Sequence, residues 1–347
     1  MAKAKKGATN MSNTMVQRME NRVNKGESWR NVTGIDSIYL AGESRNVPWA
    51  DLGNNVEEAQ TMQYALQLSG LDWVVEQSPV EYVVNGVHRK GKGLVNYRSD
   101  TGAEIGIVSP NYKPVNNIDA FNFTELLVDN GSAVYNAAGS FKGGAITFVS
   151  MELPCVEVMD ELHDRFIVVV ADHTGKHSVR IFPAIVRISC LNTLNLALRT
   201  APRVISISHI GDIAAKMENA KTALFATEKY TAEYAKAAEN MSLIKVSKSD
   251  AEALLTRLFP IPEDGVTKQR LDNIAQMREG FIAALNANDL GNFRGTALQY
   301  VQAASDFSYH RAPLRKNPKH NESIFSQLLS GSKILDTTYA WAQELVA

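Results

Sequence analysis

The segment Arg187-Ile-Ser-Cys-Leu-Asn-Thr-Leu-Asn-Leu-Ala-Leu198 stands between two halves of the chain that carry different sequence patterns. An apolar run from Pro183 to Ser189 leads into this segment and predicts a β-strand. Leu191, Leu194 and Leu198 then recur at helical spacing, which predicts a helix that follows the strand without a linker. We therefore expect the chain to change from strands to helices close to this point.

Three polar side chains of the predicted helix share one face, because Asn192, Asn195 and Arg199 are spaced at helical intervals. With Arg187 just upstream, this face would present hydrogen-bond donors and positive charge to bases or phosphates at a helix start. A structural interpretation is also open. In it, the amides satisfy the backbone at strand ends and Arg187 is paired inside the sheet.

The half of the chain before this segment is predicted to consist mainly of short strands. Turn residues divide them into hairpins, and two helices are expected among them. The expected strands are Tyr82–Val87, Leu94–Arg98, Glu104–Val108, Ala133–Ala138, Ala145–Met151, Phe166–Ala171 and Ser178–Phe182, and the expected helices are Val56–Leu68 and Asn117–Val128.

The half of the chain after Arg199 is predicted to be helical. The expected helices are Ile213–Ile244, Ser249–Leu258, Lys268–Leu285, Arg294–Phe307 and Glu322–Leu345. Strands followed by helices predict an α+β fold with a central antiparallel sheet of hairpins and a helical C-terminal region. We expect a disordered basic tail over 1–12, a strand-rich α+β core domain over 13–210, and a helical region over 211–347. That last region would pack on the core or on a partner subunit.

The composition indicates a soluble globular protein without a generally basic surface. The chain has 347 residues, 45% of them hydrophobic and 21% charged, and a formal net charge of −1. Contact with a polyanion must therefore come from local patches. The two cysteines form no disulfide framework, and no apolar run is long enough to span a bilayer. We expect a cytoplasmic protein that does not associate with membranes.

Six sequence phrases occur in a fixed order along the chain. They are Gly70-Leu-Asp-Trp73, Arg98-Ser-Asp-Thr-Gly102, Tyr112-Lys-Pro-Val-Asn-Asn117, Ala138-Gly-Ser-Phe-Lys-Gly-Gly144, Asp172-His-Thr-Gly175 and Val186 to Leu198. In this order, over roughly Gly70 to Tyr309, they resemble the phage and plasmid proteins of domain of unknown function 932. Such proteins occur in bacteriophages, prophages and plasmids, often near DNA-processing genes. The resemblance implies a protein of a mobile genetic element, and the family brings no established catalytic residues.

Two basic patches are the candidate nucleic-acid contacts. The first is an expected loop with Arg89, Lys90 and Lys92, followed by Arg98 on the next strand. Its glycines allow the backbone to approach phosphate, and its cations would release counterions on binding. The Gly-rich turn that contains Lys142 adds a further cation. The alternative for the loop is a solubilising hairpin turn.

The second patch combines aromatic and basic residues in a segment broken by proline, which is typical of single-strand binders. A solvated linker between helices is the alternative. Tyr309 or Tyr97 would stack on bases in the first interpretation. The patch consists of Tyr309, Arg311, Arg315, Lys316 and Lys319.

Other chemistry has less support in the sequence. His163, Asp172, His173 and His177 suggest a metal, but the last two flank an expected turn and so lack the spacing of a helical pair. Cys190 could pair with a histidine as nucleophile and base, although its apolar surroundings favour an inert core thiol. We predict no metal site, no cofactor and no catalytic residue.

These observations predict a non-enzymatic nucleic-acid-binding protein of a phage, prophage or plasmid. It would act in DNA recombination or replication, with single-stranded DNA as the favoured partner and annealing as one mode of action. A homo-oligomer is compatible with the long Ala-rich helix. A protein-interaction factor, such as an inhibitor of host defence or an assembly subunit, is one alternative. A metal-dependent nuclease or hydrolase is the other, with acidic residues available at Asp119, Glu125, Asp160, Glu161 and Asp172.

Overall fold

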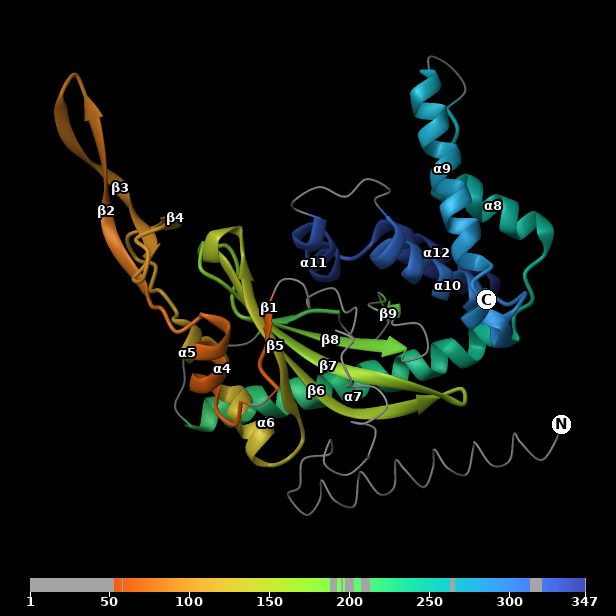
Figure 1. Cartoon of the computed structure of the whole chain (residues 1–347), viewed down its shortest axis with the longest axis horizontal. Helices are drawn as coiled ribbons and strands as arrows, with labels where there is room; N and C mark the ends of the chain where they lie inside the picture. The colour runs from red at the N-terminus through yellow and green to blue at the C-terminus, as the bar shows by residue number, and fades with distance from the viewer. Residues whose placement is uncertain are drawn as a thin grey trace.

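The structure is a computed structural model that describes residues 53–57, 59–187, 192–194, 196, 203–206, 213–262, 266–312 and 320–346. The expected basic tail over 1–12 and the segment that follows it, up to residue 52, lie outside the described residues. The described part contains two antiparallel sheets, most of whose strands precede a set of helices (Figure 1). The predicted α+β fold, with a central antiparallel sheet followed by a helical C-terminal region, is confirmed.

The main sheet is a meander whose strands run in the order β1-β5-β6-β7-β8. On one edge β8 pairs with β7, and on its other edge it pairs with both β9 and β10. Every pair of strands in this sheet is antiparallel. The strands are β1 Gly53–Asn55, β5 Val134–Phe141, β6 Ile146–Val158, β7 Glu161–Asp172, β8 Arg180–Arg187, β9 Asn192–Leu194 and β10 Ile205–Ser206.

Both faces of this sheet are covered, which explains the unbroken apolar run Phe166 to Ala171 in β7. Ile167 and Val169 belong to a core shared with the helices, whereas Phe166 and Val168 belong to a core on the opposite face. The alternation follows from the two-residue period of a strand. A central strand of this kind is buried on both sides.

The second sheet has three strands, β2 Val75–Val84, β3 Val87–Arg98 and β4 Glu104–Val108, in that order. Its long hairpin β2–β3 extends away from the main sheet and the helices (Figure 1). We call this hairpin, Val75 to Arg98, the ribbon.

Short helices flank the main sheet at the base of the ribbon: α4 Met62–Ser69, α5 Asn117–Phe121, the 3₁₀ turn η2 Asn122–Thr124 and α6 Glu125–Asp129. The long helix α7, Ile213–Leu243, runs across the sheet (Figure 1). Ala220 and Ala223 of α7 share a core with sheet residues such as Ile167, and Tyr230 and Tyr234 share another with Ile185 of β8. The helical region is thus joined to the sheet of its own chain through α7.

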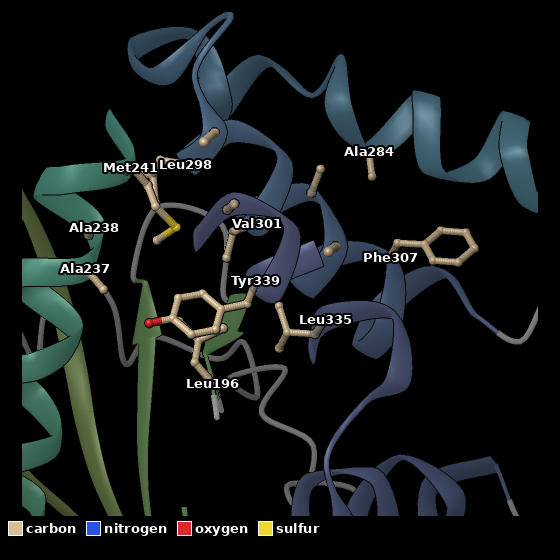
Figure 2. Packing of buried hydrophobic residues seen from close by; sticks show 14 of the residues in the cluster. Leu196, Ala237, Ala238, Met241, Ala284, Leu298, Val301, Phe307, Leu335 and Tyr339 are labelled. Atoms are coloured by element: carbon tan, nitrogen blue, oxygen red, sulfur yellow. The ribbon is translucent and has the colours of Figure 1, made fainter. Parts of the chain in front are cut away.

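The remaining helices form a bundle around α10, Ala297–Asp306, which continues into a π-helical turn η5, Phe307–Arg311. Figure 2 shows Leu298 and Val301 of α10 packed close to Met241 of α7 and to Leu335 and Tyr339 of α12. Since α10 is buried almost all round, it forms the centre of the bundle. The other members are α8 Lys248–Leu258, α9 Lys268–Leu285, α11 His320–Ser330 and α12 Lys333–Val346.

Three sequence predictions need correction. Asn192 to Leu194 form strand β9 and not a helix, because Thr193 and Leu194 pair with Val186 and Ile185 on the open edge of β8. The expected loop at Arg89 to Lys92 is part of β3, since the turn lies earlier, at Asn85 and Gly86. The expected single helix from Glu322 to Leu345 is two helices, separated at Gly331, whose φ is 92°.

Candidate nucleic-acid interface

The ribbon is two-stranded for much of its length, because β4 pairs only with Leu94 to Tyr97 of β3. Beyond that point β2 and β3 have only each other as partners in the sheet. We call the two-stranded part, Val80 to Gly93, the distal ribbon. The five residues from Val80 to Val84 advance about 3.3 Å each, so the distal ribbon extends about 16 Å beyond the three-stranded part.

The local sequence explains why this hairpin forms. Asn85 and Gly86 have φ values of 51° and 78°, the left-handed pair that a tight two-residue hairpin turn requires. Between the pairs Pro79–Leu94 and Glu81–Lys90, β2 has the single residue Val80, whereas β3 has Gly91, Lys92 and Gly93. This bulge leaves the Lys92 side chain exposed.

Glycine is needed within the bulge because the neighbouring strands come close. A Cβ on Gly91 would lie 2.9 Å from Cγ1 of Val80, and one on Gly93 would lie 2.9 Å from Cγ2 of Ile107. The glycines that the sequence suggested as a flexible loop therefore have a packing role in a strand.

The two faces of the distal ribbon differ in chemistry. Residues that pair directly across the strands project to the same face. The pairs Glu81–Lys90 and Val83–His88 form one face, which we call the acid-balanced face. The pairs Tyr82–Arg89 and Val84–Val87 form the other, which we call the apolar-arginine face.

Cations outnumber carboxylates on the distal ribbon. Arg89, Lys90 and Lys92 are exposed, and the single carboxylate is Glu81, opposite Lys90 and 3.8 Å from Nδ1 of His88. Among the residues that the structure describes, no carboxylate lies within ion-pair distance of Arg89, Lys90 or Lys92. These three cations are therefore available to an anionic partner.

Arg98, at the base of the ribbon, contacts other residues of the protein. Its guanidinium lies 4.7 Å from the Trp73 ring centre and bonds the Asp100 carboxylate at 2.6 Å, and this bond holds the pKa of Asp100 below its usual value. A Cβ on Gly144, whose φ is 96°, would lie 3.1 Å from Cδ of Arg98. Arg98 thus packs the base of the ribbon against the turn after β5.

Lys142 belongs to that same turn, η3 Lys142–Gly144. Its side chain is exposed, and its Nζ lies 5.9 Å from the centre of the Phe141 ring. The fold therefore brings Lys142 close to the base of the ribbon, where the sequence alone gave no reason to group it with the cations of β3.

The second basic patch differs from the prediction where the structure describes it. The Tyr309 ring is buried in η5, so it is not accessible for stacking on a base, and burial raises the pKa of its hydroxyl. Nε of Arg311 bonds Oδ2 of Asp306 at 2.5 Å. η5 follows α10, which lies well apart from the ribbon in Figure 1. Arg315, Lys316 and Lys319 lie outside the described residues.

The predicted polar stripe is not formed by a helix. Arg187 and Asn192 are paired residues of strands β8 and β9. Asn195 and Arg199, and with them Cys190, lie outside the described residues. Tyr97, the other candidate for stacking, is half-buried near the base of the ribbon, where a hydrogen bond with Glu76 raises its pKa.

The residues considered for metal binding do not form a cluster in the part of the chain that the structure describes. Within the described parts of the chain, no three His, Cys, Asp or Glu side chains are grouped so that they could hold a metal ion. His173 is buried, and its Nε2 lies 3.1 Å from Oγ1 of Thr147 and 2.9 Å from Oδ1 of Asn117. Burial raises the pKa of the Cys155 thiol to about 12.

The exposed apolar side chains of the distal ribbon were not predicted from the sequence. Tyr82, Val83, Val84 and Val87 are between 44% and 58% exposed. The signal that could have found them is Asn85-Gly86, which marks a tight turn between two β-type runs. With the turn placed there, alternation puts apolar side chains on both solvent faces.

Comparison with known proteins gives one match. The model of a family described as "Domain of unknown function (DUF932)" matches residues 104–329, more than half of the chain. This match confirms the resemblance that the six phrases indicated. No curated protein and no solved structure matches the chain. Among the described helices, none combines the length and apolar character needed to cross a bilayer.

Proposed function

The chain belongs to the DUF932 family, and we propose that it is a nucleic-acid-binding protein of a phage, prophage or plasmid that acts in DNA recombination or replication. The observation that carries the proposal is the distal ribbon, where Arg89, Lys90 and Lys92 project into solvent against the single carboxylate of Glu81. Cations that neutralise phosphates release counterions, which favours binding. The proposed role requires no enzymatic activity.

The proposal restricts the interface to a smaller set of residues than the sequence suggested. Arg98 is balanced by Asp100 and Arg311 by Asp306, so neither charge adds much to the attraction of a polyanion. Lys142 lies near the base of the ribbon and would contact only a nucleic acid that extends along it. We therefore assign the main contacts to the three cations of β3.

The test is a fluorescence-polarisation titration of the full chain with labelled oligonucleotides at two salt concentrations. Two to three phosphate contacts give a salt slope of about −1.4 to −2.7, so raising salt from about 50 mM to about 200 mM should weaken binding about 7- to 40-fold. The triple variant Arg89→Gln/Lys90→Gln/Lys92→Gln should lose most of the affinity and most of the slope.

A matched control removes the same number of charges from the helical region. The variant Lys248→Gln/Lys268→Gln/Arg270→Gln changes three exposed cations of α8 and α9, and it should bind as the wild type does. Equal losses in both variants would show that net charge alone matters. Absence of binding at low salt would refute the proposal.

A second candidate function is supported by the exposed apolar side chains of the ribbon. Tyr82, Val83, Val84 and Val87 suit a protein partner as well as a nucleic acid. A protein-interaction factor would retain a stoichiometric partner after nuclease treatment of a host lysate. It would lose that partner when Val84 and Val87 are replaced by threonine.

A further inference from the structure

The structural feature that points beyond general nucleic-acid binding is the shape of the distal ribbon. It is a pair of strands about 4.8 Å apart that extends about 16 Å beyond the three-stranded part. The major groove of B-form DNA is about 12 Å wide and about 8.5 Å deep and admits a two-stranded β-ribbon. We infer that the distal ribbon binds double-stranded DNA in the major groove, with the apolar-arginine face toward the base edges. This inference rests on the proposed function.

The apolar-arginine face has the groups that the floor of the major groove can accept. Val84 and Val87 pair at the tip and are exposed, so their methyl groups are free to contact thymine methyl groups. Arg89 pairs with Tyr82 on the same face. Its guanidinium presents paired donors, which match O6 and N7 of guanine.

The opposite face suits solvent and the phosphate backbone. Glu81 lies across from Lys90 and 3.8 Å from His88, so this face carries a carboxylate that would be repelled by a polyanion at close range. The long side chains of Lys90 and Lys92 can still reach phosphates at the rim of the groove. The difference between the two faces therefore determines which of them lies toward the base edges.

The same geometry favours duplex DNA over a single strand. Binding of single strands usually relies on a row of accessible aromatic rings on which successive bases stack. On the distal ribbon the exposed rings are Tyr82 and His88, which lie on opposite faces, and Tyr97 near the base is half-buried. A narrow ribbon with one ring on each face offers no row of rings for successive bases, whereas the walls of a DNA groove can contact the ribbon on both sides.

The first experiment compares the full chain on a labelled duplex and on each of its single strands. The duplex should bind at least about tenfold more tightly than either strand. Dimethyl sulfate probing of a guanine-containing duplex should show protection of guanine N7, which lies in the major groove. Protection should be weaker with Arg89→Lys, which keeps the charge but loses the paired donors.

The second experiment uses threonine substitutions, which keep the size and strand preference of valine. Val84→Thr and Val87→Thr should each weaken duplex binding about fourfold, the effect of one lost methyl contact, and leave the salt slope unchanged. Val83→Thr is the matched control on the acid-balanced face and should change nothing. The melting temperatures of all three variants should equal that of the wild type, because the side chains are exposed.

The outcomes separate this inference from the proposed function. Equal binding of duplex and single strands, with no effect of the threonine variants, would overturn the major-groove inference and leave nucleic-acid binding intact. Guanine N7 that stays reactive in the complex would also overturn it. A dimer that depends on Val84 and Val87, seen by light scattering without a change in DNA affinity, would assign this face to a second copy of the chain. No binding to either form would refute both proposals.

Discussion

Replacement of Asn117 by alanine should strongly destabilise the joint between the two sheets. Asn117 is buried at the start of α5, and its side chain makes three hydrogen bonds. Its Nδ2 donates to the carbonyl oxygen of Leu71 at 2.9 Å, and its Oδ1 accepts from Oγ1 of Thr147 and from Nε2 of His173, both at 2.9 Å. Because a carbonyl oxygen only accepts, the proton in the last bond resides on Nε2 of His173.

The expected loss follows from this set of bonds. Each buried hydrogen bond contributes about 1 kcal/mol net, so three bonds give about 3 kcal/mol. Thr147 and His173 can still bond each other at 3.1 Å, which offsets part of the loss, but the Leu71 carbonyl loses the amide that bonds it. We therefore expect Asn117→Ala to lower the free energy of unfolding by about 2 to 4 kcal/mol.

The assay is urea unfolding followed by circular dichroism, with the m-value checked for constancy. Thr147→Val should cost about 1 to 2 kcal/mol, and the double variant should cost less than the sum, because the two side chains share one bond. Asn273→Ala, on the exposed surface of α9, is the control and should not destabilise the protein. A loss below about 1 kcal/mol for Asn117→Ala, or additive effects of the single substitutions in the double variant, would show that these hydrogen bonds do not hold the joint together.

Three further predictions concern other parts of the fold. Tyr230→Phe should lower the free energy of unfolding by about 1 to 3 kcal/mol, since the Tyr230 hydroxyl bonds both the N–H and the carbonyl group of Leu196. Tyr309→Phe should be nearly neutral, because the buried Tyr309 hydroxyl has no hydrogen-bond partner among the described residues; chemical denaturation of both variants compares them. The Cys155 thiol, whose pKa rises from 9.0 to about 12, should resist thiol reagents in the native state. Because the thiol loses its proton at a lower pH in the unfolded chain than in the native protein, the free energy of unfolding should fall as the pH rises from 9 to 12. The fall should be steeper in the wild type than in Cys155→Ala, by up to about 1.4 kcal/mol per pH unit. Gly144→Ala should lower the melting temperature, because Gly144 has a positive φ and the added Cβ would lie close to Arg98. Gly291→Ala should not, since no described atom lies within 4 Å of the Cβ that it would add.

The sequence predicted best those elements whose ends are marked by local chemistry. Helix α9 has the predicted bounds, Lys268 to Leu285. In the structure the Thr267 side chain caps its start by accepting a hydrogen bond from the Arg270 N–H, so a local side chain marks this end. The helix at Glu322 to Leu345 was predicted without its break, although Gly331 offered the signal. Local patterns thus located helices well and their interruptions less well.

Strands were found, but their lengths and pairings were not. β6 and β7 extend well past the predicted runs because each continues for as long as it has a partner, and a partner is not a local property. The turn between them, at Met159 and Asp160, has φ values of 55° and 60° with neither glycine nor asparagine to mark it. Leucine spacing likewise predicted a helix where the open edge of β8 imposes a strand.

The cations of the candidate site were visible in the sequence, but their arrangement was not. Under the proposed function, this arrangement would let a protein of nearly zero net charge attract a polyanion. With a net charge of −1, the chain as a whole exerts little long-range attraction. At physiological ionic strength, exposed charges are screened over about 8 Å. The tip of the distal ribbon lies about 16 Å beyond the three-stranded part, so the carboxylates of the body contribute little there. What a nucleic acid meets at the tip is then the local balance of Arg89, Lys90 and Lys92 against Glu81, which is positive. Because the ribbon projects farther than the screening length, the electrostatic potential at the proposed interface depends on its own side chains and little on the net charge of the protein.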